Sequence, residues 1–291
     1  MAFVSAQGIA TPIPEDDEPD EDGEPYAAFG NRVPALRGFR LTFPSGRDRE
    51  IVLIQVLAGG TAQDVSPNAQ GQPTNFPDGQ LHVRLQDADP AGESFGFNVS
   101  HSVLRNSGAR RYQIRDVGCA GACTRKLPAQ VMGGGFPNPA PPGGLKPVIA
   151  LVGFKLFFTG AREHELDRVG VWFTGDELNL ALRDESVGLT DTFGYLVDFV
   201  VIPTVGLNVT RGIERGSARG LETVPFPTPS RADFVLTGWA FNFRPGDREI
   251  LDIGVLRSSN AFTVFYADNG GGEEFDWRVE WAHIAPMVFQ E

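Results

Sequence analysis

Three segments of this chain repeat one pattern, and this repetition limits the possible folds more than any other feature of the sequence. The copies begin at Gly38, Gly153 and Gly238, each followed by an aromatic residue and an apolar stretch. A Glu follows after 12, 12 and 11 residues, and a Val lies six residues beyond that Glu in every copy. Because spacing and residue types recur together, we infer three copies of one structural unit.

Each copy ends in a run with a large side chain at every second position, which puts one face of a strand into a core. In the third copy the intervening residues are Asp276, Arg278 and Glu280, as expected for the solvent face of an antiparallel sheet. The chain also contains 35 Gly and 22 Pro, which interrupt helices. We therefore predict an all-β fold. The alternating positions are Phe95, Phe97, Val99 and His101, then Phe193, Tyr195, Val197 and Phe199, then Phe275, Trp277, Val279 and Trp281.

The repeat predicts three related antiparallel β-sandwich-like modules in tandem, packed against one another. One pseudo-threefold β domain is the alternative, because isolated four-stranded units are marginally stable. Extra strands are expected from Arg110–Val117 and Lys146–Val152. The predicted modules cover residues 32–131, 148–203 and 233–291, and the predicted linkers cover 132–147 and 204–232.

The second linker carries Arg-Gly at a period of four residues, with arginines at Arg211, Arg215 and Arg219. We interpret this stretch as a solvated loop. Contact with nucleic acid or with an acidic surface, including the acidic N-terminal segment of the chain, is the alternative reading.

Residues 1–31 contain eight acidic residues and no Lys or Arg, within a chain of net charge −12. Such a stretch buries too little apolar surface to offset the entropy of ordering, so we predict a mobile tail. The remainder of the chain is only mildly acidic. We therefore do not expect nucleic acid as a partner of the protein as a whole.

The first copy contains an insertion, because 27 residues separate Val56 from Val83 where the other copies have nine. The insertion, within residues 57–80, is rich in Gly, Ser, Pro, Asn and Gln. We predict a protruding loop that contacts a neighbour, with Asn75 and Phe76 as candidate contact residues.

Residue patterns for catalysis are missing from the sequence: no nucleophile elbow, no Ser/His/Asp set and no Cys/His cluster for zinc. We therefore expect neither an enzyme nor a cofactor. An Asp recurs at the end of the third strand of each copy, at Asp87, Asp184 and Asp268. These residues are weak candidates for calcium ligands, and the alternative is that they are polar turn residues. The sequence leaves three possibilities for Cys119 and Cys123: a disulfide within one loop, bridges to other molecules, or two free thiols.

The third copy resembles the H-type lectin domain, a six-stranded β-sandwich that binds sugars as a trimer. The resemblance covers about fifty residues and is carried by Ala261–Phe265 and by the alternating stretch Phe275–Ala285. The family's Pro-Pro before the second strand is absent here. The resemblance therefore implies a fold more than an activity, and it identifies no sugar-binding residue.

We expect the protein to be a structural or attachment component of a large assembly of the virion or phage-tail type, with copies of itself and other structural proteins as partners. The alternative is a soluble carbohydrate-binding protein, in which an exposed Trp172 stacks on sugar rings. Met1–Ala10 lacks the pattern of a signal peptide, and no long apolar run is present. We therefore expect synthesis in the cytoplasm, incorporation into a particle and no membrane insertion.

Overall fold

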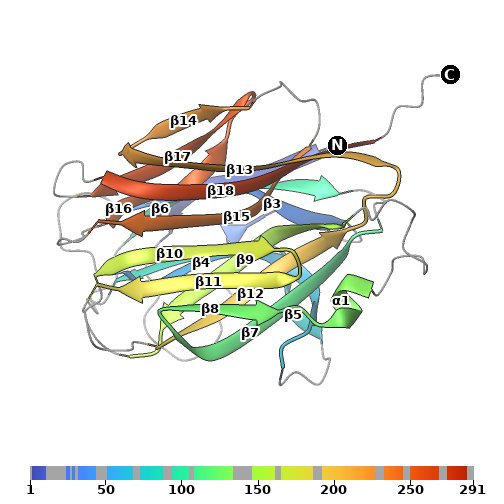
Figure 1. Ribbon diagram of the computed structural model, residues 1–291, viewed down its shortest axis with the longest axis horizontal. Helices are drawn as coiled ribbons and strands as arrows, with labels where there is room; N and C mark the ends of the chain where they lie inside the picture. The colour runs from blue at the N-terminus through green and yellow to red at the C-terminus, as the bar shows by residue number, and fades with distance from the viewer. Residues whose placement is uncertain are drawn as a thin grey trace.

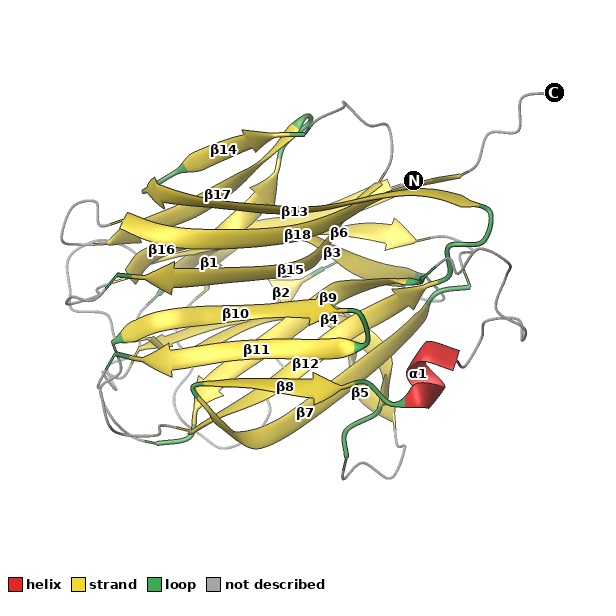
Figure 2. Ribbon diagram, in the orientation of Figure 1, coloured by secondary structure: helices red, strands yellow, loops and turns green. Residues whose placement is uncertain are grey.

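The computed structural model of the chain is built almost entirely of strands (Figure 2). One short helix, α1 (Ala129–Gly133), is the exception among the described residues. The all-β prediction is therefore confirmed. The structure describes residues 2–10, 24–26, 28–29, 32–43, 51–67, 73–87, 94–104, 108–133, 146–160, 165–185, 192–226, 233–244, 250–268 and 274–286.

Each copy of the repeat contributes six strands, in the same order along the chain. The copies therefore begin earlier than the predicted modules: residues 110–126, predicted for the first module, belong to the second copy. The first copy supplies β1 (Ala2–Ala10), β2 (Glu24–Pro25), β3 (Val33–Thr42), β4 (Ile51–Asp64), β5 (Pro73–Asp87) and β6 (Phe95–Leu104). The second supplies β7 (Arg110–Ala120), β8 (Ala122–Lys126), β9 (Val148–Phe158), β10 (Leu166–Thr174), β11 (Glu177–Asp184) and β12 (Thr192–Ile202). The third supplies β13 (Leu207–Arg219), β14 (Glu222–Pro225), β15 (Asp233–Phe243), β16 (Ile250–Arg257), β17 (Ala261–Asp268) and β18 (Glu274–Pro286).

The strands form three six-stranded sheets, and every sheet combines strands from two copies. Sheet I has the order β1-β6-β3-β16-β17-β14, and sheet III has the order β13-β18-β15-β10-β11-β8. Sheet II contains β2, β5, β4, β9, β12 and β7, with β4 paired to β9. All pairings are antiparallel except a short parallel contact between β4 and β7. The copies therefore share one pseudo-threefold arrangement, which was the alternative to tandem modules.

Glycines at the start of each repeat allow the copies to join. A Cβ on Gly38 would lie 2.6 Å from the carbonyl oxygen of Val255, and one on Gly153 would lie 2.4 Å from that of Val56. In both cases the neighbouring strand belongs to a different copy. The first glycine of the repeat is thus required by the close approach of two copies.

The shared core is centred on one aromatic residue from each copy. Phe39, Phe154 and Trp239 are fully buried, and their ring centroids lie 4.9 to 5.0 Å apart in pairs. Phe97 and Tyr195 are also buried, at equivalent places in β6 and β12. The alternation in the sequence therefore identified the side chains that fill the core.

Three segments differ from the expectation. Ala2–Ala10 is strand β1 rather than mobile chain, because its nine residues pair with β6 along their whole length. The insertion at 57–80 extends β4 and β5 into a long pair of strands instead of a protruding loop. The predicted linker 204–232 contains strands β13 and β14. Residues 11–23 of the acidic segment and 134–145 of the first linker lie outside the described residues.

Candidate functional site

Three equivalent edge strands, β1, β7 and β13, each flank the last strand of their own copy. An edge strand presents unpaired backbone groups, and proteins commonly protect such an edge from other chains. Together with β2, β8 and β14, which end the opposite margins of the three sheets, these strands are the edges at which this molecule can bind a neighbour. Figure 1 shows β13 beside β18 along one margin of sheet III.

The edge of β7 is covered by the insertion of the first copy. Gln63 and Asp64 at the end of β4 pair with β7, and the Val65 backbone N–H donates to the Gln113 carbonyl over 2.8 Å. The Arg115 N–H donates to the Ser66 hydroxyl over 2.9 Å. This end of the insertion therefore contacts the chain itself.

A buried ion pair fixes β7 to both of its neighbours. The Arg111 Nε donates to Asp198 of β12 over 2.9 Å, and the Arg111 Nη atoms donate to the carbonyls of Ala58 and Gly59 in β4. The exposed fractions of the Arg111 and Asp198 side chains are 6% and 0%. Burial raises the pKa of the Asp198 carboxyl, and the neighbouring guanidinium opposes that shift.

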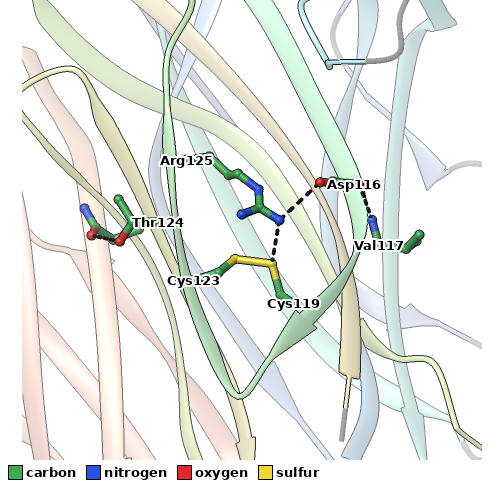
Figure 3. The surroundings of a disulfide bond; sticks show 7 residues. Asp116, Val117, Cys119, Cys123, Thr124 and Arg125 are labelled. Atoms are coloured by element: carbon green, nitrogen blue, oxygen red, sulfur yellow. Dashed lines mark hydrogen bonds and ion pairs between the residues drawn. A yellow bond between two sulfur atoms is a disulfide. The ribbon is translucent and has the colours of Figure 1, made fainter. Parts of the chain in front are cut away.

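A disulfide between Cys119 and Cys123 closes the turn from β7 to β8 (Figure 3). Because β7 lies in sheet II and β8 in sheet III, the bond joins two sheets at the point where the chain crosses between them. Arg125 lies beside the disulfide and donates to Asp116 over 3.2 Å. Of the alternatives left open by the sequence, the structure contains the bond within one loop.

The edge strand β1 is held by a buried polar group. The Tyr26 hydroxyl lies 3.1 Å from the Val4 carbonyl of β1 and 2.8 Å from Nδ1 of His101. His101 is fully buried, and its Nε2 lies 2.8 Å from the Val152 carbonyl. Because burial disfavours the charged imidazole, the pKa of His101 falls to about 4.

Among the described residues, β13 pairs with β18 alone, as β1 pairs with β6 alone. At one end of β13 the Arg211 side chain donates to the Lys146 carbonyl over 2.6 Å. Its outward residues are exposed along the whole strand. They include Ile213, with 54% of its surface exposed, while Leu221, just beyond the strand, has 62% exposed. We therefore take β13 as the candidate site for binding a neighbouring molecule.

The Arg-Gly period has a structural explanation in β13. A Cβ on Gly212 would lie 2.3 Å from the Trp281 ring, and one on Gly216 would lie 2.6 Å from the Trp277 ring. Both glycines therefore face the interior, where the two indoles fill the space that side chains would need. The arginines next to them point to solvent and are exposed. The four-residue period thus belongs to a strand, and the predicted loop is wrong for these residues.

Trp172 is less exposed than the carbohydrate-binding alternative requires. It has 9% of its surface exposed and packs with Ala181 and Ala240 on the outer face of sheet III. The guanidinium carbons of Arg168 and Arg278 each lie 5.4 Å from its ring centroid. Two cations therefore cover the ring that we expected to stack on sugars.

The remaining predicted site residues are not brought together. Asp87, Asp184 and Asp268 lie in β5, β11 and β17, one in each sheet, and Asp268 accepts a hydrogen bond from Tyr266 over 3.0 Å. Phe76 lies in β5 with its ring 5.7 Å from that of His82, and Asn75 pairs with Thr61. Within the described ranges no group of three or more His, Cys, Asp or Glu could hold a metal ion.

No helix in the part of the chain that the structure describes is long and apolar enough to cross a bilayer. No protein-family model matches this sequence, and no curated protein matches it. Among solved structures, the chain is similar to one described as the atomic structure of Sulfolobus Turreted Icosahedral Virus. The identity is 8%, the match covers 99% of this chain and 92% of that chain, and the TM-score is 0.14.

A second solved structure is described as the triple jelly roll fold and turret assembly in an archaeal virus. The identity is 8%, the match covers 98% of this chain and 91% of that chain, and the TM-score is 0.13. At such TM-scores these likenesses carry no argument about the role of this chain.

Proposed function

We propose that this protein is a non-enzymatic structural component of a multimeric assembly of the virion or phage-tail type, and that it binds its neighbours through strand β13. The observation that carries the proposal is the unpaired edge of β13, with Ile213 and Leu221 exposed beside it. An open strand edge with exposed apolar side chains favours pairing with another chain.

The contrast with β7 supports this proposal. The same edge in the second copy pairs with Gln63 and Asp64 of β4, and a disulfide closes the turn that follows β7. The chain therefore contains the means to cover such an edge and does not use it at β13. Partners in this proposal are further copies of the chain and other proteins of the particle.

Light scattering coupled to size-exclusion chromatography, followed by electron microscopy, tests the proposal. We expect a mass above that of one chain that rises with concentration, and defined particles or arrays. Ile213→Asp with Leu221→Asp should shift the mass toward one chain, because buried carboxylates at a contact are costly. Val117→Asp is the matched control, since Val117 is 64% exposed on the covered strand β7.

A monomer at every concentration, alone and with candidate particle proteins, would overturn the proposal. So would equal dissociation by the β13 variant and by the Val117 control, because the contact would then not involve β13 in particular.

A further inference from the structure

The outer face of sheet III is basic, although the chain has a net charge of −12. Residues directly opposite each other in paired strands point to the same face. Arg215 therefore lies beside Arg278 on this face, and Arg168 lies beside Arg183 in another row. Arg211 and Arg219 extend the face along β13, and one carboxylate, Glu274, lies opposite Arg219. The further residues of these rows include Ala240, Gly170, Ala181, Asn242 and Ser217.

Carboxylates on the same face are less available than the arginines. Glu280 is buried and paired with Arg278, and Asp276 accepts a hydrogen bond from Ser217. Asp167 accepts two bonds of 2.7 Å from Arg183. Glu274 lies 3.5 Å from Arg244. The three arginines of β13 are exposed, and an Nη atom of Arg211 donates to the Lys146 carbonyl over 2.6 Å. The charge presented to solvent along this margin of the sheet is therefore positive.

The sequence contains one segment of opposite character. Eight carboxylates occupy the ten positions from Glu15 to Glu24. Within one chain this segment connects β1 in sheet I to β2 in sheet II, so neither of its ends belongs to sheet III. We propose that the outer face of sheet III, along β13, binds the acidic segment Glu15–Glu24 of a second copy of this chain. This inference rests on the proposed role in an assembly.

The dimensions of the two partners agree. Arg211, Arg215 and Arg219 are spaced about 13 Å apart along an extended strand, so the row spans about 27 Å. An extended stretch of ten residues covers about 33 Å. Pro19 lacks the N–H that a strand ladder needs, so the contact is made by carboxylates and guanidiniums rather than by added backbone pairing.

Such a contact has a direction. Each copy offers one basic face and one acidic segment, so the contact repeats from copy to copy instead of closing on itself as a two-fold pair. Two basic faces placed against each other would bring arginines opposite arginines, which is unfavourable. The charge pattern therefore favours head-to-tail assembly over a symmetric pair.

A labelled peptide with the sequence of residues 11–25 tests the proposal by fluorescence anisotropy. The acceptor is the full chain with its own eight carboxylates replaced by amides, so that the face is free. We expect binding that weakens about tenfold in Arg211→Gln/Arg215→Gln/Arg219→Gln, since three exposed charge pairs are lost. Added salt should weaken binding by a similar factor.

Two controls separate the face from general charge. A triple variant of exposed arginines elsewhere, Arg32→Gln/Arg110→Gln/Arg115→Gln, should bind the peptide as the parent chain does. A peptide with all eight carboxylates amidated should not bind. Circular dichroism of both triple variants checks that the fold is retained.

The outcomes distinguish this inference from the proposed assembly role. Peptide binding that is lost only in the β13 variant supports the inference. No peptide binding by a chain that still self-associates overturns the inference and leaves the assembly role standing, whereas a chain that does neither contradicts both. Stronger binding of duplex DNA than of the peptide would also overturn it, because the face would then select phosphates.

Discussion

Strands β7 and β13 occupy equivalent places in two copies of the same repeat, yet the edge of one is paired within the chain and the edge of the other is not. The edge of β7 pairs with the end of β4, the buried pair of Arg111 and Asp198 fixes the strand, and a disulfide closes the turn that follows it. The edge of β13 is unpaired among the described residues and is lined by exposed arginines. The comparison shows that a repeated unit can become internal structure in one copy and a binding surface in another.

The largest effect is expected where β7 is fixed. Asp198→Ala removes one partner of a buried ion pair and leaves the Arg111 charge in the interior, which should cost about 3 to 5 kcal/mol in the free energy of unfolding. Urea denaturation measures this. The double variant Arg111→Met/Asp198→Leu should recover much of the loss. A single variant that unfolds like the parent would show that the pair is not buried in solution.

Strand β13 should respond next most strongly, at its inward glycines. Gly212→Val places a side chain where the Trp281 ring lies and should destabilise the protein by up to about 3 kcal/mol. Thr210→Val puts the same residue at an exposed position of β13 and is expected to be nearly neutral. Equal effects of the two variants in thermal unfolding would contradict the packing of the indole against β13.

The sequence reveals some of this packing and hides the rest. Alternation identified Phe97, Tyr195 and Trp277 as buried strand residues, because a period of two is a local signal. The Arg-Gly period of β13 resembled no strand, because glycines replaced the large inward residues. Only the position of Trp281 on β18, about seventy residues away, explains Gly212.

The pairing between copies was equally hidden. Nothing local indicates that β3 of the first copy pairs with β16 of the third, since register between distant strands depends on the whole fold. The insertion was recognised by its length, but its composition predicted a loop where the structure forms strands. The sequence therefore predicts a linker at the candidate site on β13, although it shows the spacing of the arginines.

The third edge strand, β1, provides a pH-dependent test. His101 has a pKa of about 4 in the folded protein against an ordinary value of 6.5. The unfolded chain therefore takes up a proton before the folded protein does, and stability falls as the pH drops from about 6.5 toward 4. Between pH 8 and pH 5 this group should cost about 2 kcal/mol.

The matched variant is His101→Phe, because the equivalent position of the second copy is Phe199. Between pH 8 and pH 5 the unfolding free energy of this variant should decrease less than that of the parent chain. If both chains lose the same amount between pH 8 and pH 5, the imidazole of His101 is not the group that couples β1 to pH.

Removal of the disulfide should have a smaller effect. Cys119→Ala/Cys123→Ala opens a loop with a sequence separation of 4, so we expect a loss of about 1 to 2 kcal/mol. A reducing agent should lower the denaturation midpoint of the parent chain and leave that of the double variant unchanged. If the reducing agent leaves the denaturation midpoint of the parent chain unchanged, the turn between β7 and β8 is stable without the disulfide.

The smallest effect is expected on the open edge. Ile213→Thr changes a side chain that is 54% exposed, so the free energy of unfolding of dilute protein should stay within about 0.5 kcal/mol. Ile114→Thr is the matched change on β7, where the residue is 2% exposed, and it should cost several times more. If the loss in unfolding free energy of the Ile213 variant approaches that of the Ile114 variant as the protein concentration rises, a neighbour covers β13 in solution. If the two variants cost the same at every dilution, β13 is covered within one molecule, and the contrast between the two strands is lost.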